Sequence, residues 1–305
     1  MKILVTGSSG FIGNILSQYL EHKHSIIRHG RQGVIASADN LCRVNINNNS
    51  NWEQCLQNVN AIVHLAAVAH NKSNDPDYIN EVNVKGTINL AQQAVKMGVK
   101  RFVFISSIGV LGNDTNNAKP FDEHSNVLPH SEYAQSKLDA ENALLKIAEE
   151  TDLEVIIIRP VLVYGKGAPG NFDKLASLVN KVPILPFALC DNKRSFISVD
   201  NLADFISVCL EHPKAKNEVF CISDGVDVSI KEFTNEIAKG LHTGLLQVPI
   251  PNYIFNLIGK ITSRKAQIDQ LIGDLQVNTN KAKTLLDWTP PFTMADTLSR
   301  LTRKI

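Results

Sequence analysis

Two residues with complementary proton chemistry stand four positions apart in the sequence. Tyr133 and Lys137 open a segment whose apolar periodicity predicts a helix over Tyr133–Glu150. Positions i and i+4 share one face of a helix, so the phenol and the ammonium would be neighbours. A neighbouring positive charge favours the phenolate, and we expect Lys137 to lower the pKa of Tyr133 toward neutral pH. Such a phenol can exchange a proton with a carbinol oxygen, although a surface pair without chemistry is the alternative interpretation.

A pair of hydroxyls follows the predicted strand Arg101–Ile105. Ser106 and Ser107 would stand at the carboxyl edge of a parallel sheet, where functional side chains gather. A serine there can hydrogen-bond the same substrate oxygen as Tyr133. We therefore predict that a serine hydroxyl joins the phenol and the amine at one reactive centre.

A glycine-rich loop joins the first predicted strand, Ile3–Val5, to the predicted helix Ile12–Glu21. Glycine lets the backbone turn tightly and approach a pyrophosphate, while the helix N-terminus offers free N–H groups and a partial positive charge. The alternative is a tight turn without a ligand. The predicted dinucleotide contacts in this loop are Gly7, Ser9, Gly10, Phe11, Ile12 and Gly13.

The end of the second predicted strand, Ser25–Arg28, bears on the choice of cofactor. An acid at this place would bind a ribose 2′-hydroxyl, whereas an arginine would pair with a 2′-phosphate. No acid is present, and Arg31 follows Gly30. We therefore expect NADP(H) as the cofactor, with NAD(H) as the alternative if Arg31 is only a solvated surface residue.

Several further motifs give the sequence a family resemblance along nearly its whole length. They are Thr6–Gly13, His64–Ala67, Asn83–Thr87, Ser106–Ser107, Tyr133–Lys137, Arg159–Gly165, Arg194–Leu202 and Leu286–Pro291. Together they resemble the extended short-chain dehydrogenase/reductases that modify nucleotide sugars. The resemblance implies that Ser107, Tyr133 and Lys137 are catalytic, and that Tyr133 and Lys137 also bind the cofactor. It implies further cofactor contacts at Asn45, Ile46, Leu65, Ala66, Ala67 and Pro160.

The resemblance also implies contacts to a UDP-sugar. Asn171 and Phe172 match a segment that contacts the uridine end, and Arg194 matches an arginine that binds the diphosphate. The alternatives are a helix cap for Asn171 and an ion pair of Arg194 with Asp200. Arg264 is a weaker candidate for the phosphates.

Three chemistries occur in this family: 4,6-dehydration, reduction of a 4-keto sugar and 4-epimerisation. Dehydratases follow the catalytic hydroxyl with an Asp-Glu pair, but here those positions are Ile108 and Gly109, which cannot transfer protons. We expect a 4-keto reductase of a UDP-4-keto-6-deoxy-N-acetylhexosamine in surface-polysaccharide biosynthesis. A UDP-hexose or UDP-N-acetylhexosamine 4-epimerase with tightly bound NAD is the alternative. A non-enzymatic NADP-binding sensor is the second alternative, against which the complete Ser107, Tyr133 and Lys137 set argues.

The predicted elements alternate between strand and helix, which is typical of an α/β fold with a doubly wound parallel sheet of the Rossmann type. Residues 1–165 would form the dinucleotide-binding domain, joined by returning strands in about 194–224, and residues 166–193 and 225–305 a smaller C-terminal substrate-binding lobe. The predicted strands include Ala61–Leu65, Glu154–Ile158, Phe196–Val199 and Glu218–Ile222. The predicted helices include Trp52–Gln57 and Val84–Met97.

Composition excludes several classes of function. The net charge is +1, and no strong field favours nucleic acid or a membrane surface. The nine histidines lack metal-ligand spacing, so no metal site is expected. The five cysteines form no close pair, so we expect reduced thiols. The N-terminus resembles no signal peptide, and no apolar run could span a bilayer. We therefore expect a cytoplasmic protein. The family resemblance implies a homodimer through a four-helix bundle, to which Val84–Met97 and Tyr133–Glu150 would each contribute a helix.

Overall fold

The central feature of the computed structural model, which describes residues 1–30, 40–68, 75–115, 119–251, 253–255 and 265–302, is a seven-stranded parallel sheet. Its strand order is β10-β6-β5-β4-β1-β2-β3. The strands are β1 (Lys2–Thr6), β2 (Ser25–Gly30), β3 (Leu41–Arg43), β4 (Ala61–His64), β5 (Arg101–Ile105), β6 (Glu154–Pro160) and β10 (Val219–Ile222). The order reverses between β1 and β4, which confirms the predicted doubly wound fold and places a ligand crevice at the carboxyl ends of these strands.

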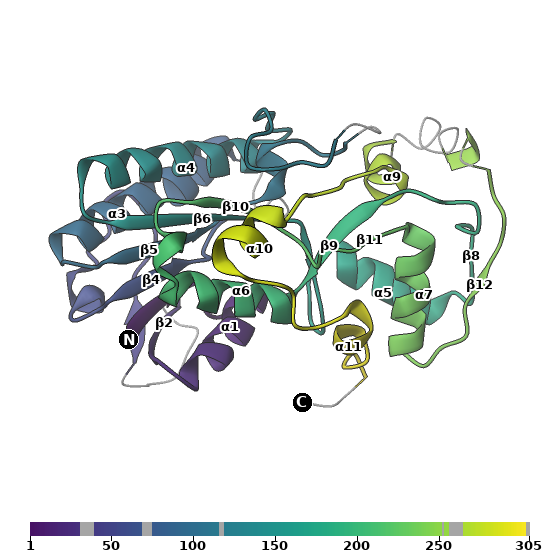
Figure 1. Cartoon of the computed structure of the whole chain (residues 1–305), viewed down its shortest axis with the longest axis horizontal. Coiled ribbons are helices and arrows are strands. Elements are labelled where there is room, and N and C mark those ends of the chain that lie inside the picture. Colours follow the sequence, from purple (N-terminus) through teal and green to yellow (C-terminus); the bar gives the residue numbers. More distant parts are fainter. Residues whose placement is uncertain (31–39, 69–74, 116–118, 252, 256–264, 303–305) are drawn as a thin grey trace.

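Helices cover both faces of this sheet (Figure 1). On one face lie α1 (Phe11–Glu21), α6 (Val199–Glu211) and α10 (Asn280–Leu286). The other face carries η1 (Glu53–Leu56), α3 (Gly86–Lys96) and α4 (Glu132–Glu150). The short helix α2 (Pro76–Asn80) and one π turn, η2 (Glu81–Lys85), lead into α3. The predicted dimer through α3 and α4 stays a prediction.

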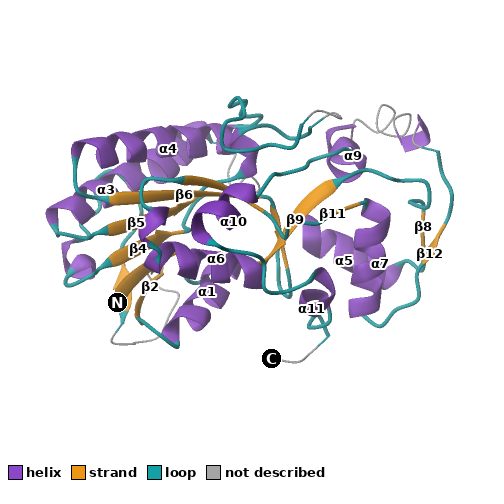
Figure 2. Ribbon diagram, viewed as in Figure 1, coloured by secondary structure: helices purple, strands orange, loops and turns teal. Residues whose placement is uncertain are grey.

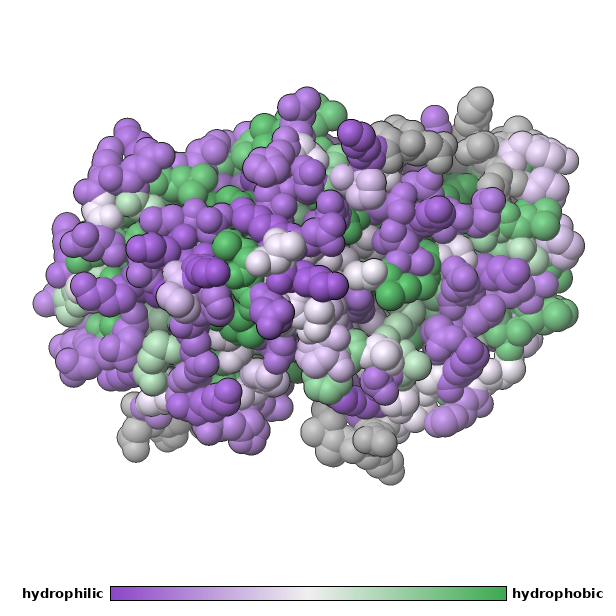
Figure 3. Space-filling model, viewed as in Figure 1, coloured by the Kyte–Doolittle hydropathy of each residue, from purple (hydrophilic) through white to green (hydrophobic). Residues whose placement is uncertain are grey.

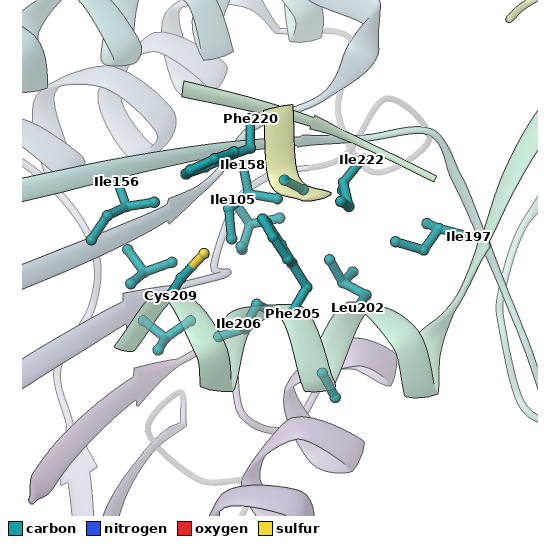
Figure 4. Close-up of a cluster of buried hydrophobic side chains, with 14 of the residues drawn as sticks. Ile105, Ile156, Ile158, Ile197, Leu202, Phe205, Ile206, Cys209, Phe220 and Ile222 are labelled. Carbon is teal, nitrogen blue, oxygen red and sulfur yellow. The ribbon is translucent and has the colours of Figure 1, made fainter. Parts of the chain in front are cut away.

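The strand sequences explain why both faces are covered. Val155–Ile158 in β6 is a continuous aliphatic run, and each of its side chains is buried, as expected for a parallel strand between two helical layers. Figure 4 shows Ile156 and Ile158 of this strand facing Phe205 and Cys209 of α6. The apolar periodicity of α6 therefore determines which of its faces packs against β5, β6 and β10.

The second, smaller lobe is built from short strands and helices (Figure 2). One three-stranded sheet contains β7 (Leu162–Tyr164), β9 (Arg194–Ser198) and β11 (Asp227–Val228), and β8 (Ile184–Leu185) pairs with β12 (Leu246–Gln247). The helices are α5 (Asn171–Lys181), α7 (Ile230–Gly240), α9 (Lys265–Ile272) and α11 (Met294–Leu298). Stacked aromatic side chains fill this lobe, with Phe196 and Phe233 at a ring-centroid distance of 4.1 Å.

The two predicted returning strands have different partners. β10 pairs with β6 and completes the main sheet, whereas β9 pairs with β7 and β11 beside it. Buried polar groups join the two parts where these strands end. The Tyr164 hydroxyl donates to Asp224 at 2.7 Å, and the Asn201 amide donates both to Asp224 at 2.7 Å and to the Phe292 carbonyl at 2.8 Å.

One expectation about the cysteines was wrong. Cys42 on β3 and Cys55 in η1 form a disulfide, although thirteen positions separate them in the sequence. Sequence spacing could not reveal this pair, because the sheet order brings β3 and η1 together. Cys190, Cys209 and Cys221 are buried and form no disulfide among the described residues, as predicted.

Hydrophilic side chains cover most of the face seen in Figure 3, and apolar side chains are scattered in small patches. Within the described ranges, no helix has both the length and the apolar character needed to cross a bilayer. The same residues contain no group of three side chains placed to hold a metal ion.

Candidate active site

The glycine-rich loop lies at the carboxyl end of β1, and two of its glycines are required by close backbone contacts. Gly7 has a φ of +69°, and a Cβ atom there would lie 2.9 Å from the Ala66 nitrogen. A Cβ atom at Gly13 would lie 2.2 Å from the Gly7 oxygen. Gly10 is different, since its only near neighbour would be the Gly7 oxygen at 3.2 Å. The first and third glycines therefore shape the loop, and the side of Gly10 is open to a ligand.

The N-terminus of α1 follows this loop directly. Gly10 is its N-cap residue, and no side chain caps the helix, so the first N–H groups remain available to an anion. Ser9 and Gly10 are exposed, while Phe11 and Ile12 are half-buried. The predicted pyrophosphate contacts thus surround one open concave turn, and these residues fit a dinucleotide.

A chain of buried hydrogen bonds links this loop to the helix that carries Tyr133. The Thr6 hydroxyl accepts from the Leu65 and Ala66 N–H groups at 3.2 Å and lies 2.8 Å from His64 Nδ1. His64 Nε2 lies 2.9 Å from the Thr87 hydroxyl, which donates to the Asn83 carbonyl at 2.7 Å. Because Thr87 donates its proton to that carbonyl, its oxygen accepts from His64 Nε2. Thr6 already accepts two N–H groups and donates its own proton to His64 Nδ1, so the ring is neutral in this arrangement. Burial also lowers the pKa of His64 well below its usual range.

Asn83 carries the chain onward to α4. Its side-chain amide donates to the Ser136 hydroxyl at 3.0 Å, and Ser136 donates to the Tyr133 carbonyl at 2.8 Å. Asn83 also accepts from the Val68 N–H at 2.7 Å, which holds the segment after Ala66 and Ala67 in place. One polar network therefore positions both the segment around Ala66 and Ala67, which is predicted to contact the cofactor, and the helix that carries Tyr133 and Lys137.

Ser107, Tyr133 and Lys137 come together at the carboxyl end of β5. Lys137 is 2% exposed, donates to the Ile105 carbonyl at 2.8 Å and lies 4.5 Å from the centre of the Phe104 ring. Its Nζ atom is 5.9 Å from the centre of the Tyr133 ring. Ser107 is half-buried, and its hydroxyl accepts from the Gly109 N–H at 3.1 Å. The amine therefore lies near the phenol ring and binds the last carbonyl of β5, and Ser107 follows that carbonyl by two residues.

The ionisation of this group differs from the expectation. Burial lowers the pKa of Lys137 to about 7, although Glu141 partly opposes the shift. Burial raises the pKa of Tyr133 to about 12, so Lys137 does not hold the phenol near its ionisation point in the ligand-free protein. The physical reason is that burial desolvates both groups. It disfavours the phenolate, and it leaves Lys137 close to losing its proton, with one N–H group donated to the Ile105 carbonyl.

The other predicted cofactor residues follow the carboxyl ends of several strands, with Leu65, Ala66 and Ala67 directly after β4. Asn45 is exposed after β3, and Ile46 packs so closely on Gly86 that a Cβ atom there would lie 2.5 Å from its side chain. Pro160 is buried at the end of β6. Arg31, on which the preference for NADP(H) depended, lies outside the described residues.

The predicted substrate residues lie in the smaller lobe. Arg194 donates to the Gly273 carbonyl at 2.9 Å, and burial lowers its pKa to about 10. The alternative ion pair with Asp200 was wrong, because Asp200 pairs with Arg300 at 3.1 Å. Arg264 lies outside the part of the chain that is described.

Asn171 and Phe172 open α5 and face different surroundings. Gly170 is the N-cap residue of this helix, so Asn171 is not the cap, and its side chain is exposed. Phe172 is buried against the rings of Tyr164 and Phe233, so a contact of Phe172 with substrate could involve only its backbone.

Two features of the site were not predicted from the sequence. Glu141, one helical turn beyond Lys137 on α4, forms an ion pair with Arg159 of β6 at 2.6 Å. Both side chains are more than nine-tenths buried. His130 stands three residues before Tyr133, and its Nδ1 lies 3.3 Å from the Gly109 carbonyl. The ion pair had a signal in the sequence, because Arg159 stands in an apolar strand and Glu141 four positions after Lys137. His130 had no such signal, because it lies in a loop.

Comparison with known proteins agrees with this geometry. Residues 3–223 match the family model described as NAD dependent epimerase/dehydratase family. The chain belongs to this family of extended short-chain dehydrogenase/reductases. A UDP-glucose 4-epimerase of Vibrio cholerae is 41% identical over 303 residues, covering 97% of this chain and 92% of the relative. A GDP-6-deoxy-D-mannose reductase of Pseudomonas aeruginosa is 27% identical, covering 78% of this chain and 79% of the relative.

Solved structures show the same fold. A short-chain dehydrogenase/reductase superfamily protein of Agrobacterium tumefaciens with bound NAD has a TM-score of 0.77 at 18% identity, covering 99% of this chain and 96% of that one. A UDP-glucose 4-epimerase of Thermotoga maritima with UDP-glucose has a TM-score of 0.75 at 22% identity, covering 99% and 97%. The family and these relatives make the protein an enzyme of the nucleotide-sugar epimerase/dehydratase type.

Proposed function

We propose that the protein is an NAD-dependent 4-epimerase of a UDP-hexose or UDP-N-acetylhexosamine. The observation that carries this proposal is the 41% identity, along 97% of the chain, to the UDP-glucose 4-epimerase of Vibrio cholerae. This supports the epimerase, which the sequence ranked second, over the 4-keto reductase that it ranked first. The matching family model is described as NAD dependent, which supports NAD over NADP(H).

The open turn at Gly10 and the uncapped N-terminus of α1 would hold the pyrophosphate of the dinucleotide. Leu65, Ala66 and Ala67 would lie along the cofactor, and Lys137 would reach it from α4. When bound there, an oxidised nicotinamide dinucleotide supplies the hydride acceptor for C4 of the sugar and a positive charge that favours the phenolate of Tyr133. Arg194 would pair with the diphosphate of the sugar nucleotide through the N–H groups that do not face Gly273.

The reacting oxygen on C4 would lie between Ser107 and Tyr133. Ser107 hydrogen-bonds this oxygen, and Tyr133 removes its proton as the alcohol is oxidised and returns a proton when the ketone is reduced on its other face. Ile108 and Gly109 carry no group that could remove water across C5 and C6. The chain's own residues thus support proton transfer at one oxygen and no elimination.

The test uses the purified full chain and UDP-glucose, with UDP-N-acetylglucosamine in parallel, and no added cofactor. We expect NMR to show conversion to the 4-epimer, and NAD to be released when the protein is denatured. Failure with both sugars, together with NADPH oxidation by a UDP-4-keto-6-deoxy-N-acetylhexosamine, would replace the epimerase by the reductase.

A further inference from the structure

An exposed histidine lies beside the predicted reactive serine. A Cβ atom at Gly109 would lie 3.1 Å from His130 Cε1 and 3.2 Å from Ser107 Oγ. The edge of the imidazole and the serine hydroxyl therefore border the same small space. His130 enters from the loop before α4, whereas Ser107 follows β5, so two separate elements bring these groups together.

The hydrogen bond of His130 leaves one ring nitrogen for a ligand. His130 Nδ1 lies 3.3 Å from the Gly109 carbonyl, which can only accept, so Nδ1 is assigned as the donor. In the neutral ring, Nε2 is then an acceptor. Nε2 is bonded to the same Cε1 atom that lies near Ser107, and none of the described residues hydrogen-bonds it.

Gly109 leaves room for this arrangement. Any larger residue would place its Cβ atom in the space that the His130 ring and the Ser107 hydroxyl share, at distances tighter than ordinary van der Waals contact. The absence of a side chain at position 109 thus does more than remove a proton-transferring group. It admits the histidine ring to the reactive centre.

From this geometry we propose that His130 determines specificity by accepting a hydrogen bond from a hydroxyl next to C4 of the hexose. The inference rests on the proposed function, in which Ser107 holds the oxygen on C4. A group beside Ser107 then faces the atoms adjacent to C4, which carry the C3 hydroxyl and the C6 hydroxymethyl group. Both offer the O–H donor that a free imidazole nitrogen accepts.

The experiment compares wild type and His130→Ala on UDP-glucose, UDP-3-deoxyglucose and UDP-6-deoxyglucose. We expect His130→Ala to lower kcat/KM for UDP-glucose by about three- to tenfold, the range for one neutral hydrogen bond. Wild type should lose a similar factor on one of the two deoxy sugars, and His130→Ala should lose nothing further on that sugar. If removing the imidazole and removing one sugar hydroxyl do not lower kcat/KM additively, that hydroxyl is the one that His130 binds.

Two further variants separate binding from a general effect on the loop. His130→Gln keeps a polar side chain with an acceptor and should recover part of the loss. His124→Ala removes another exposed histidine of the same loop and should leave all three values unchanged. Equal losses on both deoxy sugars in wild type and in His130→Ala, or full activity of His130→Ala, would overturn the assignment of His130. A wild type inactive on both UDP-glucose and UDP-N-acetylglucosamine would overturn the proposed function itself, and this inference with it.

Discussion

At the scale of single residues, Lys137 combines a central position with an unfavourable environment. Burial lowers its pKa from the ordinary 10.5 to about 7, so the folded protein holds the ammonium less well than the unfolded chain does. This destabilisation of the folded protein has its full size below pH 7 and decreases as the pH rises from 7 toward 10.5. Each unit of lowered pKa corresponds to about 1.4 kcal/mol, so the cost near pH 7 is a few kcal/mol.

We therefore expect Lys137→Met to make the ligand-free protein more stable at pH 7 while abolishing its activity. The gain in unfolding free energy should be a few kcal/mol and should shrink as the pH rises to 8.5. Urea unfolding of both proteins at several pH values measures this difference. Lys146→Met is the matched control, because Lys146 lies on the same helix but is exposed, and it should show no such trend. A constant difference across the range would contradict the lowered pKa.

Tyr133 is the second residue whose role is open to direct test. Tyr133→Phe removes only the hydroxyl that would exchange a proton with the oxygen on C4, and the rate should fall by roughly a hundredfold or more. Steady-state turnover of UDP-glucose measures the effect. Unchanged thermal unfolding would show that the variant is folded, and activity within a few-fold of wild type would exclude Tyr133 as the proton-transferring group.

Residue motifs predicted much of the candidate site. The spacing of Tyr133 and Lys137 and the position of Ser107 after β5 led to one place in the structure, because a helix repeat and a strand end are local features. The ionisation of Tyr133 was not predictable, since its pKa depends on how deeply the whole fold buries the phenol. His130 was missed because the conformation of a loop, and not a periodic pattern, brings it to Ser107.

At the scale of elements, the ion pair of Glu141 and Arg159 joins α4 to β6. Glu141 is 1% exposed and Arg159 6%, so neither charge can be left alone without a large desolvation cost. Arg159→Met should lower the unfolding free energy by about 3–5 kcal/mol. The double variant Glu141→Leu with Arg159→Met should be more stable than the single one, and denaturant unfolding of all four proteins tests this. Additive losses would show that the two charges do not depend on each other.

The disulfide joins β3 to η1 close in sequence to the predicted cofactor contacts Asn45 and Ile46. Closing a loop of this length stabilises a protein by about 3 kcal/mol through the unfolded chain. We expect Cys42→Ala with Cys55→Ala to be less stable than wild type by that amount without reductant, and the difference to vanish with reductant. Alkylation in denaturant should modify only the three other cysteines before reduction. Modification of all five would contradict the disulfide.

The longer elements were predictable because their patterns are strong. Continuous apolar runs in β1, β5 and β6 mark strands buried on both faces, and the predicted helix Tyr133–Glu150 differs from α4 by one residue. β3 and β7 were missed, since three-residue strands carry too few side chains for a pattern. The separate sheet of β9 was also beyond reach, because strand order depends on contacts between distant segments.

At the scale of the whole molecule, the last part of the chain ties the two lobes together. After α9 it passes Phe121 through an isolated bridge at Val277, and Trp288 then donates to Asp204 of α6 at 2.7 Å. Phe292 exchanges two backbone hydrogen bonds with the Asn201 side chain. The yellow segment in Figure 1 crosses the face of the larger lobe in this way. The lobes are therefore held by covalent continuity and by these contacts of the C-terminal segment with the larger lobe.

The pairing of β10 with β6 has a consequence for how the protein is made. A ribosome delivers β6 well before β10, and between them it delivers β7, α5 and β9, which belong beside the sheet and not in it. Until Val219–Ile222 emerges, the apolar run of β6 ends the sheet with unpaired backbone groups on one side. Exposed edges of this kind invite pairing between nascent chains. We therefore expect a chain truncated between β6 and β10 to aggregate and not to form a smaller nucleotide-binding domain.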